Sequence, residues 1–294
     1  MIGRRAWIRD NLASLAYLTD PVADQLVRST GLTREVARRM LGLQLGAVFG
    51  YLSTRVLGQY EVFLPGGREP GRLTLVGPNL VHLERTLLPE TDVSPPEFRM
   101  GIALHEIAHR LQFEGVGWMR PTLRSLLDDY LADARVDPER MRATVERAGE
   151  MLRSPQRLFD SKQLLELVLT SAQRTVLERA QNLMALLEGH GNAVMDWGAK
   201  VVAIEDGIDL DPSRVRRVLN ERRKRPTDKA MRKAMGLSMK AEQYRIGERF
   251  ILSVADTHGQ DMFNRVWEDA DHVPTAAELE EPEDWVARVS GQSR

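Results

Sequence analysis

The sequence predicts a mainly α-helical protein of the α+β class, with a small antiparallel or mixed β-sheet in its N-terminal third. Two runs rich in β-forming residues, 60–64 and 72–76, are separated by a stretch of glycines and prolines. This pattern favours a hairpin whose loop is longer than two residues. After Pro95 almost every segment has helical character. We therefore expect a helical bundle with a small sheet near its front.

Capping and turn residues predict where the other elements of the N-terminal region begin and end. The first fifty residues have helical character, and Thr33 is a candidate N-cap for a helix that ends near Phe49. Residues 77–79, Gly-Pro-Asn, indicate a turn. Residues 80–83 are then expected to form a third short strand.

The helix that begins after Ser94 is the most strongly marked element. Ser94 and Glu97 have the spacing of a capping box, and Pro95 falls in the first turn, where proline is tolerated. Apolar residues fill most positions from Phe98 to Leu111. A helix that is apolar on most sides is typical of the protein interior, so we expect this one to be mostly buried.

Composition narrows the kinds of site that the chain can build. It has 294 residues, with 41 Lys and Arg against 42 Asp and Glu, no cysteine and six histidines. The balanced charge gives no argument for nucleic acid or an anionic membrane as a partner. Without cysteine there is no disulfide, thiol nucleophile or thiolate metal site. Histidine and carboxylate side chains would therefore have to hold any transition metal.

The length fits a single domain over residues 1–294, with a subdivision into 1–115 and 116–294 as the alternative. No stretch approaches the roughly 20 apolar residues of a membrane-spanning helix. The N-terminus is interrupted by charged residues and does not follow the pattern of a signal peptide. We expect a cytoplasmic protein.

The chemistry is expected in the helix after Ser94, which contains the pattern HExxH. His105 and His109 are four residues apart, so their imidazoles lie one turn apart on one face and can bind one metal ion. Glu106 lies at the flank of that face, where it can act as a general base towards a water on the metal. Gly101 shares the histidine face and would leave room for substrate or another strand. The alternative is a buried, hydrogen-bonded histidine pair with a salt-bridged glutamate.

A third metal ligand is expected in a second apolar helix around residue 188. Glu188 and His190 lie on different sides of a continuous helix, with Glu188 on the polar side and His190 on the apolar side. Glu188 is the expected ligand, and His190 is the alternative ligand if Gly189 and Gly191 break the helix. Otherwise His190 is a core residue or supports a ligand. Asp196 could orient a ligand histidine, or be an ordinary carboxylate at a helix end.

The sequence resembles the actinobacterial family of zincin-like hydrolases, which are zinc-dependent metalloprotease-like proteins labelled as associated with the biosynthesis of the deazaflavin coenzyme. The extended motif HExxHxxQFE at residues 105–114 is more specific than HExxH alone. The segments that carry the resemblance are residues 56–64, 76–80, 103–114, 186–190, 194–196, 240–247 and 265–268. The resemblance implies a zincin fold and a zinc-dependent hydrolase whose substrate is not settled.

The leading functional hypothesis is a zinc metallopeptidase. Zn²⁺ would be held by His105, His109 and Glu188, and Glu106 would take a proton from the zinc-bound water and pass it to the leaving amine. In zincins an edge strand binds the extended substrate; here the segments before Pro78 or residues 80–83 are expected to supply it. The candidate donors to the oxyanion are three side chains among which the sequence does not choose, namely His82, Tyr130 and Tyr244.

Two other functions remain open at this point. The protein could bind zinc without catalysis, although a structural site has no need of the general base Glu106. It could also be an amide or ester hydrolase that acts on a small anionic metabolite, attracted by the basic run 214–225. That run has a simpler interpretation as a solvated helix end. The expected partner is a peptide or small-molecule substrate, not nucleic acid or a membrane.

Overall fold

The computed structural model describes residues 1–29, 42, 46, 48–65, 70–132, 170–205, 210–224 and 240–291. In this part of the chain the structure is mostly helical, with a small two-stranded antiparallel sheet near the N-terminus, as the sequence predicts. The helices are α1 (Arg4–Ser29), α3 (Gly77–Thr86), α4 (Pro95–Gly115), α5 (Met119–Ala132), α8 (Ser171–Glu205), α9 (Pro212–Lys224), α11 (Lys240–His258), α12 (Gln260–Asn264), α13 (Ala276–Glu280) and α14 (Pro282–Val289). Short 3₁₀ helices are η1 (Leu88–Glu90), η3 (Arg265–Trp267) and η4 (Ala270–His272).

The sheet is the predicted hairpin with slightly different strand limits. Strands β1 (Gly58–Glu61) and β2 (Arg72–Leu75) pair antiparallel, with Gly58 opposite Leu75 and Glu61 opposite Arg72. The N-terminus of the chain lies beside β2, where the Ile2 N–H donates to the Leu75 carbonyl over 2.9 Å. Ile2 thus pairs with the chain at the end of β2, where it forms a bridge with Val76.

The predicted third strand at residues 80–83 is wrong, because this segment lies in α3. Pro78 sits in the first turn of that helix, where its fixed backbone and missing N–H cause no loss. Leu80 and Leu83 are buried against the core, and their spacing of three places them on one helix face. A short apolar run does not distinguish a strand from a helix by its period, so the predicted turn before it is instead the start of α3. Thr33 and most of the helix predicted after it lie outside the described residues.

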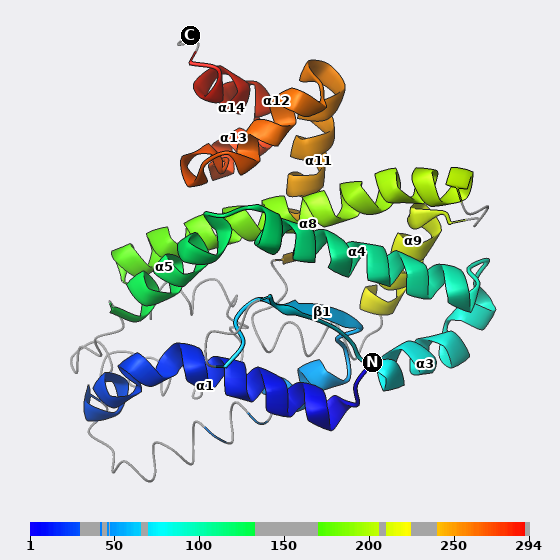
Figure 1. Ribbon diagram of the computed structural model, residues 1–294, viewed down its shortest axis with the longest axis horizontal. Coiled ribbons are helices and arrows are strands. Elements are labelled where there is room, and N and C mark those ends of the chain that lie inside the picture. Colours follow the sequence, from blue (N-terminus) through cyan, green and yellow to red (C-terminus); the bar gives the residue numbers. More distant parts are fainter. Residues whose placement is uncertain are drawn as a thin grey trace, which may run out of the picture.

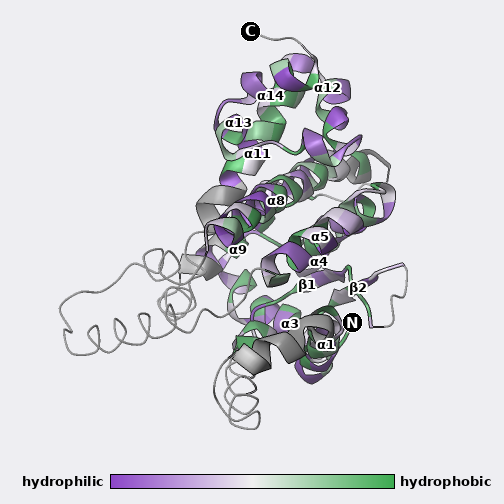
Figure 2. Ribbon diagram, turned by 90° about the vertical axis from the view of Figure 1, so that its left-hand side faces the viewer, coloured by the Kyte–Doolittle hydropathy of each residue, from purple (hydrophilic) through white to green (hydrophobic). Residues whose placement is uncertain are grey.

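The elements form successive layers across the molecule. Figure 2 shows α1 and α3 at one end, then the sheet, α4 with α5, α8, and finally the C-terminal helices α11 to α14. In Figure 1, α4 and α8 lie side by side, with β1 on the other side of α4. Three apolar clusters fill the spaces between layers, centred on Phe98, on Phe250 and on Met119. Burial of these side chains, at about 25 cal/mol per Å², holds the layers together.

Two glycines let α8 and α11 cross at very short distance. A Cβ atom on Gly189 would lie 2.5 Å from the backbone nitrogen of Glu248, and one on Gly247 would overlap the carbonyl of Ala185. Glycine here serves packing and does not interrupt the helix, since α8 continues through both Gly189 and Gly191. Glu188 and His190 therefore lie on different sides of one continuous helix.

None of the helices described here combines the length and apolar character needed to cross a membrane.

Candidate metal centre

Helix α4 carries the HExxH residues and is fixed firmly at its start. The predicted capping box is present: Ser94 accepts a hydrogen bond from the backbone of Glu97, and the Glu97 side chain accepts one from the backbone of Ser94. The same Glu97 carboxylate forms an ion pair of 3.2 Å with Arg214 of α9 and accepts from the backbone N–H of Asp211. The side chain of Glu97 therefore both caps the N-terminus of α4 and joins α4 to α9.

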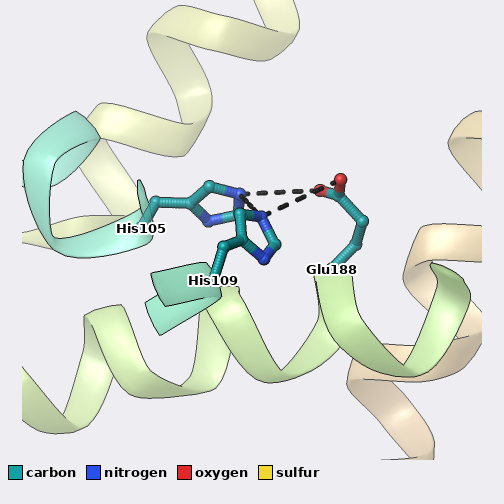
Figure 3. Close-up of side chains that lie close together, drawn as sticks. All are labelled: His105, His109 and Glu188. Atoms are coloured by element: carbon teal, nitrogen blue, oxygen red, sulfur yellow. Dashed lines mark hydrogen bonds and ion pairs between the residues drawn. The ribbon is translucent and has the colours of Figure 1, made fainter. Parts of the chain in front are cut away.

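His105 and His109 direct the same ring atom towards each other. Their Nε2 atoms are 3.2 Å apart, and the two rings meet edge to face with centroids 4.7 Å apart. Glu188 of α8 approaches both, with 3.5 Å from its Oε2 to His105 Nε2 and 4.0 Å from its Oε1 to His109 Nε2 (Figure 3). The side chains of His105, His109 and Glu188 are 22%, 14% and 28% exposed, so the group is reachable from solvent.

These three side chains have the donors and the spacing of a site for a transition metal. One ligand atom from each lies within 4.8 Å of the others. A tetrahedral zinc ion with ligands at 2.0–2.2 Å needs donor atoms about 3.3 Å apart, close to the separations found here. Two imidazoles and one carboxylate also match the three protein ligands of catalytic zinc sites, although other first-row divalent ions bind such a set. The His-His-Glu group could therefore hold a metal ion.

The surroundings of His109 favour the neutral imidazole that a metal requires. Burial lowers the pKa of His109, and the nearby His105 lowers it further, while Glu188 acts in the opposite direction. A neutral imidazole has an unprotonated nitrogen whose lone pair can bind a metal. Burial therefore favours the form of His109 that can bind a metal over a histidinium ion paired with Glu188.

Glu106 lies beside this group and in contact with the sheet. Its side chain is buried, and this burial raises its pKa from 4.5 to about 7; the neighbouring Glu188 carboxylate adds to the rise, whereas His105 and a hydrogen bond from the Tyr60 backbone oppose it. A Cβ atom on Gly58 would lie 2.6 Å from Glu106 Cγ, so β1 can approach only because glycine stands there. A carboxylate with a pKa near neutrality suits a general base.

Gly191 shapes the group, whereas Gly101 has a different role from the one predicted. A Cβ atom on Gly191 would lie 2.9 Å from Cε1 of His105, so the glycine allows α8 to approach the ring. Gly101 was expected to leave room for substrate or a strand. It instead packs against Val215 of α9, where a Cβ atom would meet the valine side chain at 3.0 Å. The small residue serves a helix–helix contact because α9 occupies that position.

His190 is separate from the three-residue group and lies on the apolar side of α8. Its ring contacts Trp267, Phe263 and Trp197, at centroid distances of 4.8, 5.7 and 6.2 Å. Burial lowers the pKa of His190 to about 4. The structure therefore brings Glu188 to the two α4 histidines, and it gives His190 an aromatic environment.

Gln112, the glutamine of the extended motif, is a residue whose role the sequence did not indicate. It is buried, its Oε1 is 2.9 Å from His109 Nδ1, and its Nε2 is 3.0 Å from the Leu187 carbonyl and 2.9 Å from His190 Nδ1. The signal in the sequence is its place in the extended motif HExxHxxQFE, three residues after His109. Its partners on α8 are distant along the chain and could not be predicted from that motif.

Asp196 pairs with an arginine of α9. Its carboxylate accepts a hydrogen bond of 2.7 Å from Arg216 of α9, and so it links α8 to α9 and does not orient a histidine. Arg214 and Arg217, from the same basic run, pair with Glu97 and Asp92. The first half of the run 214–225 thus joins α9 through ion pairs to α4, to α8 and to the loop before α4. The side chains of residues 222–225 lie outside the described residues.

Of the three candidate donors to an oxyanion, only His82 and Tyr130 have described side chains. The Tyr130 carbonyl accepts a hydrogen bond from Gln173, which precedes Glu188 on α8 by about 22 Å of helix. His82 is exposed on α3 and does not belong to the His-His-Glu group. The side chain of Tyr244 lies outside the described residues.

Comparisons with known proteins place the chain in a family. A solved structure from Chloroflexus aurantiacus, described as a putative hydrolase with a novel fold, is 28% identical and superposes with a TM-score of 0.63 over 100% of this chain and 80% of that one. Among curated proteins, none matches the sequence. The zincin-like metallopeptidase family matches residues 1–286, which is nearly the whole chain. With its HExxH helix and its His-His-Glu group, the chain belongs to the zincin-like metallopeptidase family.

Proposed function

We propose that this protein is a zinc-dependent metallopeptidase. The observation that carries the proposal is the position of Glu106, a buried carboxylate with a pKa near 7, directly beside a group that could hold a metal ion. A structural metal site needs no such neighbour, whereas hydrolysis needs a base to activate water. Membership of the zincin-like metallopeptidase family supports hydrolysis, and the peptide substrate is our proposal.

Each residue of the site has a defined task in this proposal. His105, His109 and Glu188 would hold the zinc ion. When bound, the ion lowers the pKa of water to about 7 and polarises the substrate carbonyl. Glu106 accepts a proton from the attacking water as the new C–O bond forms, and it donates that proton to the amine nitrogen as the C–N bond breaks.

The hairpin is the proposed element for binding an extended substrate. Residues 80–83 are helical, so of the two segments considered from the sequence only the strands before Pro78 remain. Strand β1 is in contact with Glu106 through Gly58, which brings the backbone of the sheet next to the proposed base. A peptide that adds to this sheet would lie across the His-His-Glu group.

An amide or ester hydrolase for a small anionic metabolite is less well supported. It relied on the basic run 214–225, but Arg214, Arg216 and Arg217 already form ion pairs with carboxylates. Reversing the charge at Arg222 and Arg223 tests the remaining half of the run, and unchanged activity would exclude this use of it. The association with deazaflavin coenzyme biosynthesis stays a prediction of the sequence resemblance.

The test of the proposal separates zinc binding from hydrolysis. Glu106→Gln should keep one zinc per chain, measured by elemental analysis, and lose about 10²–10⁴-fold in cleavage of a peptide library. Glu178→Gln, at an exposed position of α8, should keep both properties. If wild-type protein carries zinc and cleaves no more than Glu106→Gln on a broad library, the peptidase proposal fails.

A further inference from the structure

Gln112 connects His109 to a buried histidine on another helix. It is 2% exposed, although its amide carries one acceptor and two donor hydrogens. All of these groups have partners in His109, Leu187 and His190. A buried amide that is fully hydrogen-bonded has one stable orientation, because turning it over would set the Gln112 oxygen, an acceptor, against the Leu187 carbonyl oxygen, another acceptor.

The Leu187 carbonyl determines which way this amide faces. A carbonyl oxygen can only accept a hydrogen bond, so the atom of Gln112 that lies 3.0 Å from it must be Nε2. The Oε1 atom therefore faces His109 Nδ1 at 2.9 Å. An oxygen acceptor at that distance requires the hydrogen of His109 to be on Nδ1. The lone pair of His109 is then on Nε2, the atom that faces His105 and Glu188.

His190 uses the second hydrogen of the same amide. Its Nδ1 is 2.9 Å from Gln112 Nε2, so Nδ1 accepts and the ring hydrogen of His190 lies on Nε2. The ring is held in place by Trp267 at 4.8 Å and by Phe263 at 5.7 Å between centroids. Trp267 is itself held, since its carbonyl accepts from Trp118 Nε1 over 2.8 Å. Contacts with the C-terminal region thus fix the orientation of His190.

We propose that Gln112 is a positioning residue that fixes the tautomer of His109, and that His190 is the acceptor that holds Gln112 in place. The inference rests on the proposed function only in taking His109 as a metal ligand. It assigns His190 a role without making it a ligand. It also predicts that the metal affinity depends on an aromatic cluster contributed by α8, α12 and η3.

The first experiment reads the tautomers directly in metal-free wild-type protein. Two-bond ¹⁵N–¹H correlation spectra distinguish Nδ1–H from Nε2–H imidazoles. We expect the Nδ1–H form for His109 and the Nε2–H form for His190. The Nε2–H form for His109 would overturn the proposal. This arm needs no variant, metal or substrate.

The second experiment measures Zn²⁺ affinity by competition with a chromophoric chelator, together with the absorption spectrum of the Co²⁺ form. Gln112→Leu should weaken Zn²⁺ binding by about 10–100-fold and change the Co²⁺ spectrum. The matched control is Gln173→Leu, since Gln173 is also buried and also donates to a backbone carbonyl, that of Tyr130. It should leave both measurements unchanged. Equal affinities for Gln112→Leu and wild type, or equal losses in the two variants, would overturn the proposal.

Two variants of His190 separate its ring from its acceptor. His190→Phe keeps an aromatic ring and removes the acceptor for Gln112, so Zn²⁺ affinity should fall, by less than in Gln112→Leu. His190→Asn loses the ring but can place an oxygen near the former Nδ1, so it should bind Zn²⁺ more tightly than His190→Phe. The reverse order would contradict a role through Gln112.

The outcomes distinguish this inference from the proposed function. If zinc binds and the tautomers are as expected, but no peptide is cleaved, the peptidase proposal fails and the inference stands. If peptide is cleaved and Gln112→Leu binds zinc as wild type does, the inference alone fails. If His105→Ala does not lower Zn²⁺ affinity, the proposed metal centre fails, and the tautomer measurement still decides the role of Gln112.

Discussion

Helices α4 and α8 contribute to the same group in different ways. His105, Glu106 and His109 stand within one turn and a half of α4, and the helical repeat alone determines which of them face the same side. Glu188 comes from a distant part of the chain, and its approach depends on small residues such as Gly191. One half of the group therefore follows from spacing within a helix, and the other half from packing between helices.

The largest expected effect tests whether α8 contributes a ligand at all. Glu188→Ala should reduce Zn²⁺ affinity by more than the roughly 100-fold upper end expected for residues that only support a ligand. Asp196→Ala removes a carboxylate of the same helix that is paired with Arg216, and it should leave the affinity nearly unchanged. Both are measured by chelator competition. If the two variants bind zinc equally well, α8 supplies packing and no ligand.

The next prediction concerns Glu106, on the α4 side, in metal-free protein. Burial raises its pKa from 4.5 to about 7, a shift equivalent to about 3 kcal/mol. Because the pKa in the folded protein is above that in the unfolded chain, the stabilising contribution is complete below pH 4.5 and is lost as the pH rises through 7. Glu106→Gln does not titrate, so its advantage in free energy of unfolding should grow from near zero at pH 4.5 to about 3 kcal/mol at pH 8.

Urea denaturation at several pH values measures this difference. A difference that stays constant between pH 4.5 and 8 would show that the environment of Glu106 does not disfavour its charged form. Helix α4 would then supply the correct spacing of His105, Glu106 and His109, but its burial would not raise the pKa of Glu106.

A smaller effect is expected from Gly191, which tests the packing side of the comparison. The added Cβ of Gly191→Ala would meet the His105 ring, and a side chain can move away more easily than backbone. Zn²⁺ affinity should fall by roughly tenfold, the lower end of the roughly 10–100-fold loss expected when a residue that supports a ligand is changed. The free energy of unfolding should stay close to that of wild type.

Gly198→Ala is the matched control, and we expect it to have the smallest effect. The added Cβ would find only Leu104 at an ordinary contact distance of 3.8 Å. Replacing glycine by alanine within a helix should then stabilise the protein by about 0.5–1 kcal/mol, without a change in Zn²⁺ affinity. Thermal unfolding and chelator competition check both variants. A loss of affinity in Gly198→Ala equal to that in Gly191→Ala would argue against a specific contact with His105.

Sequence reasoning was most successful where a feature depends on neighbouring residues. The capping box at Ser94, the face shared by His105 and His109, and the hairpin at residues 60–76 all follow from local spacing. The helical residues 80–83 were assigned to a strand because their short apolar run has no clear period, and the decisive contact of Leu80 with the core is not local.

The candidate site divides in the same way. Helical periodicity predicts Glu188 on the polar side and His190 on the apolar side. This prediction requires only that α8 be continuous, and it is. Periodicity within one helix does not reveal that Asp196 contacts Arg216 of α9, or that Gln112 contacts Leu187 and His190. Those contacts join residues far apart in the chain, and single-sequence patterns carry no information on such pairs.

The division of ligands between two helices has a consequence for folding. This chain contains no cysteine, so no covalent cross-link holds α4 to α8. A zinc ion bound by His105, His109 and Glu188 would close the long stretch of chain between the two helices, much as a disulfide does. An ion that binds only the folded protein stabilises it by about 4 kcal/mol at 1,000 times its Kd. Removing zinc would then lower the free energy of unfolding as well as remove the metal needed for hydrolysis, so one ion would serve both the fold and the chemistry.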